Sequence, residues 1–581
     1  MILVFTKVTK INCYILNILY YFSFNLAYIE IKSQSFLEKK KIFLSLKKKK
    51  IYQIDNSFFK QKSLHKFYKD TDSTVKKKTN QILDLNVTRQ FFLRLKSKIK
   101  NNDKNLKLLV QHQVANCYMN YSFYMSIFSK IYKNKIILLS FDWQDFFIPN
   151  ITNVTKVILP LNLFNILFKK ITSHKRIERN SENLNINYDA KVGYIIHESF
   201  SYSQLYKKDN YYSKANNSNF NSKNIIHFFY SNKNPSNSVY INVDKVLGRL
   251  QIIKIYLNYI VNIRNINDFV YAFYFANEEI KFYGFINFFK KFKNLKIILI
   301  DFDLLCPKSI LLVLTSLNIK IVSLQERSIS KYNLPTYTFF CDYLLADSNY
   351  LKKNTNSNYT FKNYFTVGYP RADLVRNKIP EYPNKTILCL GLSPSDVLSK
   401  DIIHPLTNFY FQKFFIEEIM RLASEFRSYK FVIRYKYSDW LKSTFFSKTL
   451  KQIKNTENLS IDFNTHDKNL TTYIKCIKSD LIISCYSTIV EEMVFIKKPV
   501  FVFDYTEYIN SCFKNIVDKN LRFLFCNSYE ELRSKIKFYT EETLQFYDKL
   551  NFINSKMLFP KKEINSRRLI QSSLENILKS I

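Results

Sequence analysis

The sequence predicts an α/β protein made of two doubly wound, parallel-sheet domains that follow a basic N-terminal extension. Short apolar runs alternate with helix-like segments from about residue 225 to about residue 540, a pattern typical of parallel sheets. Polar clusters follow several of these runs, and side chains at the carboxyl ends of parallel strands line ligand sites. The segment Pro380-Glu381-Tyr382-Pro383 divides the alternation into two blocks of similar length.

The composition excludes a wholly disordered chain but does not assign a function. The 581 residues are 47% hydrophobic and 17% aromatic, which provides ample material for cores. A net charge of +41 normally indicates nucleic acid or an anionic membrane surface as a partner. The chain has only 5 Gly but abundant Lys, Asn, Ile, Phe and Tyr, as an AT-rich genome would encode. We therefore attribute part of the charge to drift of exposed positions towards lysine.

The nine cysteines are scattered, without a Cys-x-x-Cys pair or neighbouring histidine ligands. Most of them lie in or beside apolar runs, as free thiols in protein cores do. This pattern favours a reducing compartment and argues against structural zinc and against a disulfide framework.

Residues 1–110 are predicted to be an apolar segment followed by a basic arm. Residues 11–29 are uncharged and largely apolar, a length that is borderline for a membrane span and equally suits a buried helix or an interfacial anchor. Residues 31–110 contain 22 Lys or Arg against 6 Asp or Glu. Such a segment can hold a cytoplasmic protein to anionic lipid, and it can also be a solvated, partly disordered arm.

Residues 111–224 are predicted to be an α/β region that ends in a linker. Strand-like runs occur at 136–141 and 192–196, and residues 203–224 are rich in Ser, Asn, Lys and Tyr, as linkers are. His197-Glu198-Ser199 follows the second run and is a candidate acid–base cluster, although a lone histidine at a strand end more often has a structural role.

The first doubly wound domain is assigned to residues 225–380. Its expected helices are 246–263, 278–291 and 308–317, and its expected strands are 225–230, 269–275, 295–301, 319–324, 342–346 and 364–367. Three polar clusters follow strands of this block, and we expect a ligand at that edge of the sheet. These clusters are Asp301-Phe302-Asp303, Gln325-Glu326-Arg327 and Asp347-Ser348.

The segment Val367 to Asp373, which reads VGYPRAD, ends the first domain. Gly368 permits a turn that other residues resist, and Pro370 fixes its backbone. Arg371 and Asp373 are then presented at the start of a helix. The alternative interpretation is a turn that joins two domains and carries a surface ion pair.

The second domain is assigned to residues 381–560, with a final C-terminal helix at 561–581. Its expected strands are 386–390, 431–435, 459–462, 480–484, 500–503 and 523–526, and its expected helices are 410–426, 470–477, 489–496 and 528–538. Residues 541–581 are expected to be helical and to pack back across the domains.

The stretch from Ser479 to Asp504 reads as strand, turn, helix and strand. Hydroxyl groups and free N–H groups at a helix N-terminus are suited to holding a phosphate, and Ser487 and Thr488 occupy that position. A glutamate one turn further on could reach a ribose. The alternative is that Ser487 only caps the helix, with Glu491 as its capping-box partner.

Taken together, these motifs resemble those of GT-B glycosyltransferases, which have two Rossmann-like domains. The resemblance is greatest to CDP-glycerol glycerophosphotransferases, capsule transferases and surface carbohydrate biosynthesis proteins, and it covers about residues 225–540. It rests on the runs Asn318–Arg327, Asp342-Tyr343, Gly368–Asp373 and Ser479–Val500.

The resemblance implies roles for individual residues. Ser487 and Thr488 would contact the donor diphosphate, Glu491 or Glu492 the ribose, and Arg371 the phosphates at the interdomain cleft. Gln325, Arg327 and Asp373 would face the acceptor, and Arg434 and Lys436 would supply cations to the donor. Glu326 stands where many relatives carry a histidine base, so Glu326 is the candidate base here. The chemistry implies no metal and no cofactor, since the nucleotide-activated donor is a substrate.

The resulting functional hypothesis is a transferase that moves a sugar or a glycerol-phosphate-type group from a nucleotide-activated donor to a surface polysaccharide acceptor, glycan or lipid-linked. We expect it at the inner, cytoplasmic face of the cell membrane, held by its basic segment or an N-terminal anchor. Two alternatives stay open. One is a UDP-sugar 2-epimerase of the same fold, and the other is a non-catalytic basic protein that binds nucleic acid, with a steep salt dependence, or a membrane.

Overall fold

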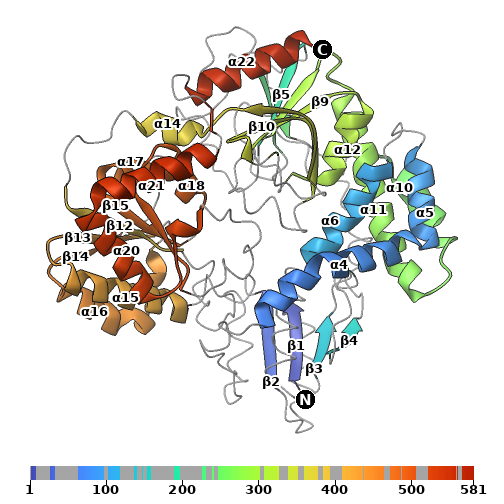
Figure 1. Ribbon diagram of the computed structural model, residues 1–581. Coiled ribbons are helices and arrows are strands. Elements are labelled where there is room, and N and C mark those ends of the chain that lie inside the picture. Colours follow the sequence, from blue (N-terminus) through green and yellow to red (C-terminus); the bar gives the residue numbers. More distant parts are fainter. Residues whose placement is uncertain are drawn as a thin grey trace.

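The structure is a computed structural model of the whole chain, and it contains three parallel β-sheets with helices packed on them (Figure 1). The residues that it describes are 2–7, 27–32, 63–96, 103–117, 136–140, 147, 154–158, 189–196, 225–229, 239–240, 247–300, 306–325, 338–350, 352, 359–376, 384–392, 409–435, 438–463, 471–485, 487–505, 521–557, 559–560 and 565–581.

The first sheet has four parallel strands in the order β2-β1-β3-β4. It joins strands from two segments that the sequence predicted to be separate, 1–110 and 111–224. Residues 11–26 lie outside the described residues. Among the helices that the structure describes, none is long and apolar enough to cross a membrane. The strands are β1 (Ile2–Lys7), β2 (Ala27–Lys32), β3 (Ile136–Ser140) and β4 (Val154–Ile158).

Part of the predicted basic arm is folded into helices. These are α4 (Ser63–Leu83), α5 (Asn86–Lys96) and α6 (Asp103–Cys117). Helix α5 lies beside α10 (Arg249–Ile260) and α11 (Ile266–Phe289) in Figure 1. The interpretation of this part as a solvated arm is therefore wrong. The physical reason is a buried stripe at helical spacing on α5, formed by Val87, Phe91 and Leu95. Lys76, Lys77 and Lys96 are exposed, so a high charge does not prevent packing.

An ion pair between the half-buried Arg94 and the buried Glu279 also fixes α5 to α11. Arg94 donates from Nε and Nη2 to the Glu279 carboxylate, with the closest contact at 2.7 Å. The Tyr259 hydroxyl donates to the same carboxylate at 2.5 Å. Phe91 packs on Phe275 with 4.8 Å between ring centroids. The N-terminal helices are thus part of the first-domain core.

The second sheet has seven parallel strands in the order β11-β10-β9-β8-β5-β6-β7. The strand at 192–196, which the sequence placed in the preceding region 111–224, lies inside this sheet between β8 and β6. The strands are β5 (Val192–Ile196), β6 (Ile225–Phe229), β7 (Val239–Tyr240), β8 (Ile297–Ile300), β9 (Lys320–Leu324), β10 (Phe339–Ala346) and β11 (Tyr359–Thr366).

The helices of this domain include one element that the sequence did not predict. The strand expected at 269–275 is wrong, because α11 is a single helix over Ile266–Phe289. All residues from 270 to 280 are buried, and a fully buried helix has the same unbroken apolar pattern as a buried strand. The other helices are α10 (Arg249–Ile260), α12 (Lys308–Ser316) and α14 (Pro370–Arg376).

The third sheet has six parallel strands in the order β14-β13-β12-β15-β16-β17. Its strands are β12 (Thr386–Leu390), β13 (Lys430–Arg434), β14 (Leu459–Asp462), β15 (Leu481–Ser484), β16 (Val500–Phe503) and β17 (Phe525–Cys526). Its helices are α15 (Phe409–Glu425), α16 (Ser447–Lys454), α17 (Thr471–Lys478), α18 (Thr488–Phe495), α20 (Tyr529–Glu541) and α21 (Thr543–Lys556). The predicted α/β class is confirmed by these parallel sheets.

The C-terminal helix α22 (Ser566–Lys579) returns to the second sheet, above which it lies in Figure 1. Its residues Ile570, Leu574 and Ile577 are buried in one apolar cluster with strand residues of β5, β8 and β9. Their spacing of three and four residues places them on one face of the helix. The end of the chain therefore packs on the second sheet, although it follows the helices of the third sheet in the sequence.

Candidate functional site

A small cavity lies between the two domains, where the first turn of α14 meets the first turn of α18. Its volume is about 20 Å³, which is room for about one water molecule. Four residues predicted from the sequence to form the site, Gln325, Arg371, Thr488 and Glu492, lie in its wall. The complete lining is Leu324, Gln325, Asp347, Tyr369, Pro370 and Arg371 from the first domain, and Thr488 and Glu492 from the second.

Parallel-strand geometry explains why these residues meet. Gln325 follows β9 and Asp347 follows β10, so both side chains stand at the carboxyl edge of the second sheet. The two residues are linked, since the Asp347 N–H donates to Gln325 Oε1 at 3.1 Å. In the third sheet, α18 begins after the carboxyl end of β15. The cavity therefore lies between the carboxyl edges of two sheets.

Tyrosine hydroxyl groups hold the two glutamates of α18. The Tyr369 hydroxyl donates to Glu491 Oε2 at 3.0 Å, which joins the two domains directly. The Tyr473 hydroxyl donates to Glu492 Oε2 at 2.6 Å. Glu491 and Glu492 are only 2% and 3% exposed, so each carboxylate needs such a donor.

Asp347 completes a cluster of three buried carboxyl groups. Its side chain is 1% exposed, and neither carboxylate oxygen has a hydrogen-bond partner of good geometry among the described residues. Burial raises the pKa of Asp347 well above its ordinary value, and the charges of Glu491 and Glu492 raise it further. The nearby Tyr369 hydroxyl and the Arg371 guanidinium oppose the shift only in part. Burial at the cavity therefore favours the protonated form of Asp347 more than it is favoured in an exposed aspartate.

The N-terminus of α18 is not closed by a capping box. Ser487 is the N-cap residue with extended backbone, but its side chain makes no capping hydrogen bond. The carboxylate of Glu491 accepts from Tyr369, which lies in the other domain. Ser487 and Thr488 are both half-buried. The Val490 N–H donates to the Ser487 carbonyl at 3.1 Å, so the Ser487 side chain leaves the N–H groups of Thr488 and Ile489 uncapped, as the phosphate interpretation requires.

Arg434 lies at the carboxyl end of β13, outside the cavity wall. Its side chain is 1% exposed and forms an ion pair with Asp462, and its Nε donates to Thr472 Oγ1 at 3.1 Å. Lys475 contacts the same Asp462 carboxylate. These two cations lower the pKa of Asp462, although burial alone would raise it. The predicted donor-binding role of Arg434 stays a prediction, beside this structural role.

Asp373 is turned towards the C-terminal helix. Its Oδ2 accepts the backbone N–H of Ser566, the first residue of α22, at 2.7 Å. Gly368 has φ +76°, in the left-handed region that favours glycine, and a Cβ there would lie 2.6 Å from Ser566 Oγ. The turn before α14 is therefore shaped to receive α22, while acceptor binding by Asp373 stays a prediction.

Several predicted residues lie outside the described residues, namely Glu326, Arg327, Lys436 and the cluster His197-Glu198-Ser199. The structure instead adds Asp347 and Tyr369 to the candidate site. The sequence contained a signal for each, since Asp347 directly follows a strand and Tyr369 lies inside the Gly-Tyr-Pro-Arg turn. Their convergence could not be predicted, because they face residues more than a hundred positions away.

The described residues contain no group of three His, Cys, Asp or Glu side chains arranged to hold a metal ion. The absence of metal and cofactor therefore stays a prediction. Six cysteines of the described residues are buried thiols, namely Cys306, Cys341, Cys389, Cys476, Cys485 and Cys526. Burial raises the pKa of Cys485 to about 12, so that thiol is unreactive at neutral pH.

Comparison with known proteins gives only a distant likeness. No protein-family model matches the sequence, and no curated protein matches it. Solved structures do match. The structure of S. aureus MnaA with UDP is 10% identical, with 68% of this chain and 98% of that chain covered at a TM-score of 0.40. A UDP-GlcNAc 2-epimerase from Neisseria meningitidis bound to UDP-GlcNAc is 13% identical. The match covers 67% of this chain and 99% of that chain, at a TM-score of 0.39.

The wall teichoic acid polymerase TagF, soaked with CDPG, is also similar. It is 13% identical and covers 72% of this chain and 96% of its own, at a TM-score of 0.35. The similar structures thus include a UDP-GlcNAc 2-epimerase and a wall teichoic acid polymerase. At such identities and TM-scores they carry no argument about the reaction, which must rest on this chain's own residues.

Proposed function

We propose that the protein is a transferase that moves a sugar or a glycerol-phosphate-type group from a nucleotide-activated donor to a surface glycan acceptor. The observation that carries this proposal is the meeting of Arg371 with Thr488 in one interdomain cavity. A guanidinium, a hydroxyl and the first-turn N–H groups of α18 together form a site suited to a diphosphate.

The electrostatics of the cavity suits the bond cleavage. As the bond from the transferred group to the nucleotide breaks, negative charge grows on the leaving nucleotide, a nucleoside diphosphate when a sugar is transferred and a nucleoside monophosphate when a glycerol-phosphate group is transferred. The N-terminus of α18 and Arg371 are fixed groups of positive potential that stabilise this charge. The acceptor hydroxyl oxygen forms the new bond, and its proton must pass to a base.

Two carboxyl groups line the cavity, Asp347 and Glu492, and we assign this role to Asp347 because Glu492 already accepts a hydrogen bond from the Tyr473 hydroxyl. Asp347 lines the same cavity as Arg371 and Thr488, and its raised pKa makes it a stronger base than an ordinary aspartate once it has lost its own proton. Glu326, the base that the family resemblance implies, is tested in the same experiment as Asp347. If Asp347 is the base, Asp347→Asn abolishes turnover while nucleotide binding persists, and Glu326→Gln retains turnover.

The cavity holds about one water molecule, whereas a nucleoside diphosphate is far larger. Donor binding therefore requires the domains to part near the Tyr369–Glu491 hydrogen bond, by the hinge motion common in two-domain enzymes. Closure after binding would exclude water from the reacting groups.

A thermal-shift panel with CDP, UDP, GDP and CMP derivatives tests the donor site. We expect at least one nucleotide to raise the melting temperature, and Arg371→Ala and Thr488→Ala to reduce the shift. Arg376→Ala is the matched control, because Arg376 lies in the same helix but pairs with Asp373 and does not line the cavity. If a folded protein is stabilised by none of these nucleotides, the proposal fails.

The second candidate is a UDP-sugar 2-epimerase. Such a reaction removes and returns a proton at carbon and needs closely placed acid and base groups. The observation that favours the epimerase is the buried cluster of three carboxyl groups, Asp347, Glu491 and Glu492. Incubation with UDP-N-acetylhexosamines and no acceptor distinguishes the two, because only an epimerase changes the sugar.

We also propose a peripheral position at the inner face of the membrane. The support is the excess of Lys and Arg over Asp and Glu in residues 31–110, of which α4, α5 and the start of α6 are folded.

A further inference from the structure

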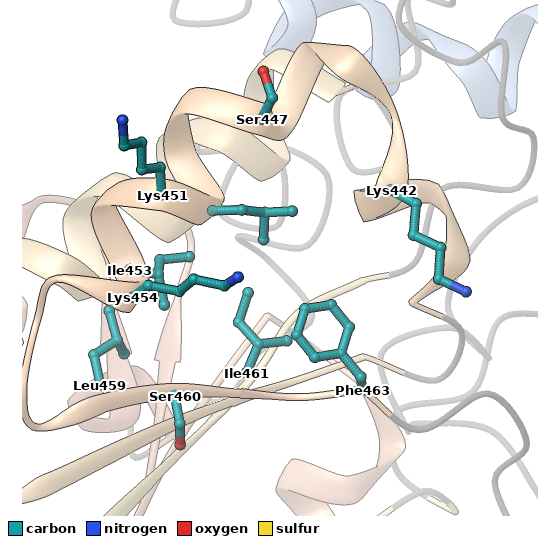
Figure 2. A pocket seen from close by; sticks show the side chains of 10 residues that line it. Lys442, Ser447, Lys451, Ile453, Lys454, Leu459, Ser460, Ile461 and Phe463 are labelled. Carbon is teal, nitrogen blue, oxygen red and sulfur yellow. The ribbon is translucent and has the colours of Figure 1, made fainter.

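A second pocket lies at the edge of the third sheet, between helix α16 and the edge strand β14 (Figure 2). Its volume is about 550 Å³, within the range of roughly 300–1,000 Å³ found for small-molecule sites. We call it the α16–β14 pocket. The residues that line it are Lys442, Ser447, Leu450, Lys451, Ile453, Lys454, Leu459, Ser460, Ile461 and Phe463.

The floor of the α16–β14 pocket is apolar. Strand alternation places Leu459 and Ile461 towards α16 and Ser460 away from it, as Figure 2 shows. Phe463 follows the strand and is 54% exposed at the pocket. A large aromatic ring left in water beside an open apolar floor is suited to contact with an apolar ligand.

Cations surround this apolar floor. Helix α16 reads SKTLKQIK and carries Lys448, Lys451 and Lys454 without an acidic residue. Figure 2 shows the Lys454 side chain extending over the pocket towards Ile461, whereas Lys451 points outwards from the helix. The amine of Lys442 is held at 2.9 Å by Asp439. The α16 lysines therefore give the pocket its positive potential.

The neighbouring acidic groups do not cancel this charge. Asp462 is engaged by Arg434 and Lys475, and Asp439 by Lys442. Glu457 is exposed in the turn that precedes β14. The described part of this region thus keeps a net positive charge next to an apolar cavity.

We propose that the α16–β14 pocket binds an anionic membrane phospholipid, with one acyl chain along the apolar floor and the headgroup phosphate at Lys454, which extends over the pocket. A small hydrated anion would not use the apolar floor, and a neutral hydrophobe would not use the lysines. A phospholipid satisfies both, since lysine stems can lie on apolar surface while the ammonium groups meet phosphate. The proposal does not depend on the donor site.

The full-length protein is tested with dioctanoyl-phosphatidylglycerol below its micelle concentration, which isolates the pocket from the basic N-terminal region. We expect saturable binding, measured by calorimetry, and weaker binding of the phosphatidylcholine analogue. Lys454→Gln should weaken binding about fivefold, the loss expected for one cation near a lipid phosphate. Phe463→Ser should weaken it several-fold.

Matched controls separate the pocket from general charge and apolar exposure. Phe552→Ser removes a phenylalanine of α21 that is 53% exposed, and Lys537→Gln removes an exposed lysine of α20. Both should leave binding unchanged. Equal effects of control and pocket variants, or equal binding of inorganic phosphate, would overturn the proposal. A nucleotide-induced thermal shift that survives in the pocket variants shows that the fold and donor site are intact.

Discussion

The Tyr369 hydroxyl donates a hydrogen bond to Glu491 Oε2 at 3.0 Å, joining residues that are 122 positions apart. Both side chains are buried. Tyr369 also packs edge-on against Phe495 of α18, with 5.6 Å between ring centroids. Tyr369 therefore links the turn before α14 in the first domain to helix α18 in the second domain, and its side chain forms part of the cavity wall.

Tyr369→Phe should lower the free energy of unfolding by about 1–3 kcal/mol, because a buried carboxylate loses a donor while the ring packing is kept. Urea denaturation measures the change. Tyr547→Phe, in α21 and outside the cavity, is the control and should have a smaller effect. An unchanged unfolding midpoint in the Tyr369 variant would show that the interdomain bond contributes nothing.

Asp347→Asn should stabilise the protein at neutral pH and have little effect in acid. The pKa of Asp347 is raised in the folded state, so above its ordinary value of 3.8 the folded chain binds more protons than the unfolded chain. Stability then falls as pH rises towards the folded-state pKa. Asparagine cannot titrate, so the variant lacks this fall.

Urea denaturation from acid to neutral pH measures this difference. Asp342→Asn serves as the comparison, because Asp342 is paired with Lys362 at 2.7 Å and its loss should bring no gain at neutral pH. Parallel stability–pH curves for the wild type and the Asp347 variant would contradict a raised pKa.

Gly368→Ala should destabilise the protein by roughly 1–2 kcal/mol from backbone strain alone, since φ is +76°. The added Cβ would also meet Ser566 Oγ at 2.6 Å and push α22 from its place. Thermal unfolding measures the loss. Gly248→Ala is the matched control, because nothing lies within 4 Å of its Cβ position and its φ is −63°. Equal stability of the two variants would refute the strain argument.

Arg434→Leu should lower the free energy of unfolding by about 3 kcal/mol, because it breaks an ion pair of a fully buried guanidinium. The loss should shrink in acid, since the lowered pKa of Asp462 stabilises the fold only while that group is ionised. Arg533→Leu breaks the partly exposed pair with Glu425 and should cost less than about 1 kcal/mol.

Nucleotide titration of the Arg434 variant separates its two roles. An unchanged affinity in the folded variant would leave Arg434 with a structural role only. A large loss of affinity without a matching loss of stability would support the predicted donor contact.

Local patterns were sufficient for most of the elements around the site. The strand, turn and helix at 481–495 follow from a short apolar run, a polar turn and helical spacing, and the structure has them within a residue or two. The pattern failed at 269–275, where a helix buried on every side has no polar face to reveal its period. It also failed in the basic region, where apolar residues such as Phe91 lie in a helix otherwise rich in cations.

The sequence by itself determined the α/β class, the two alternating blocks and the positions of Arg371, Thr488 and Glu492 at helix starts, because strand and helix periods and strand ends are local properties. Only the tertiary structure decided that these residues meet Asp347 and Tyr369, that Asp373 holds α22, and that three carboxyl groups share one buried space. Such contacts join distant parts of the chain, and burial, which sets the pKa of Asp347, exists only after the domains have packed.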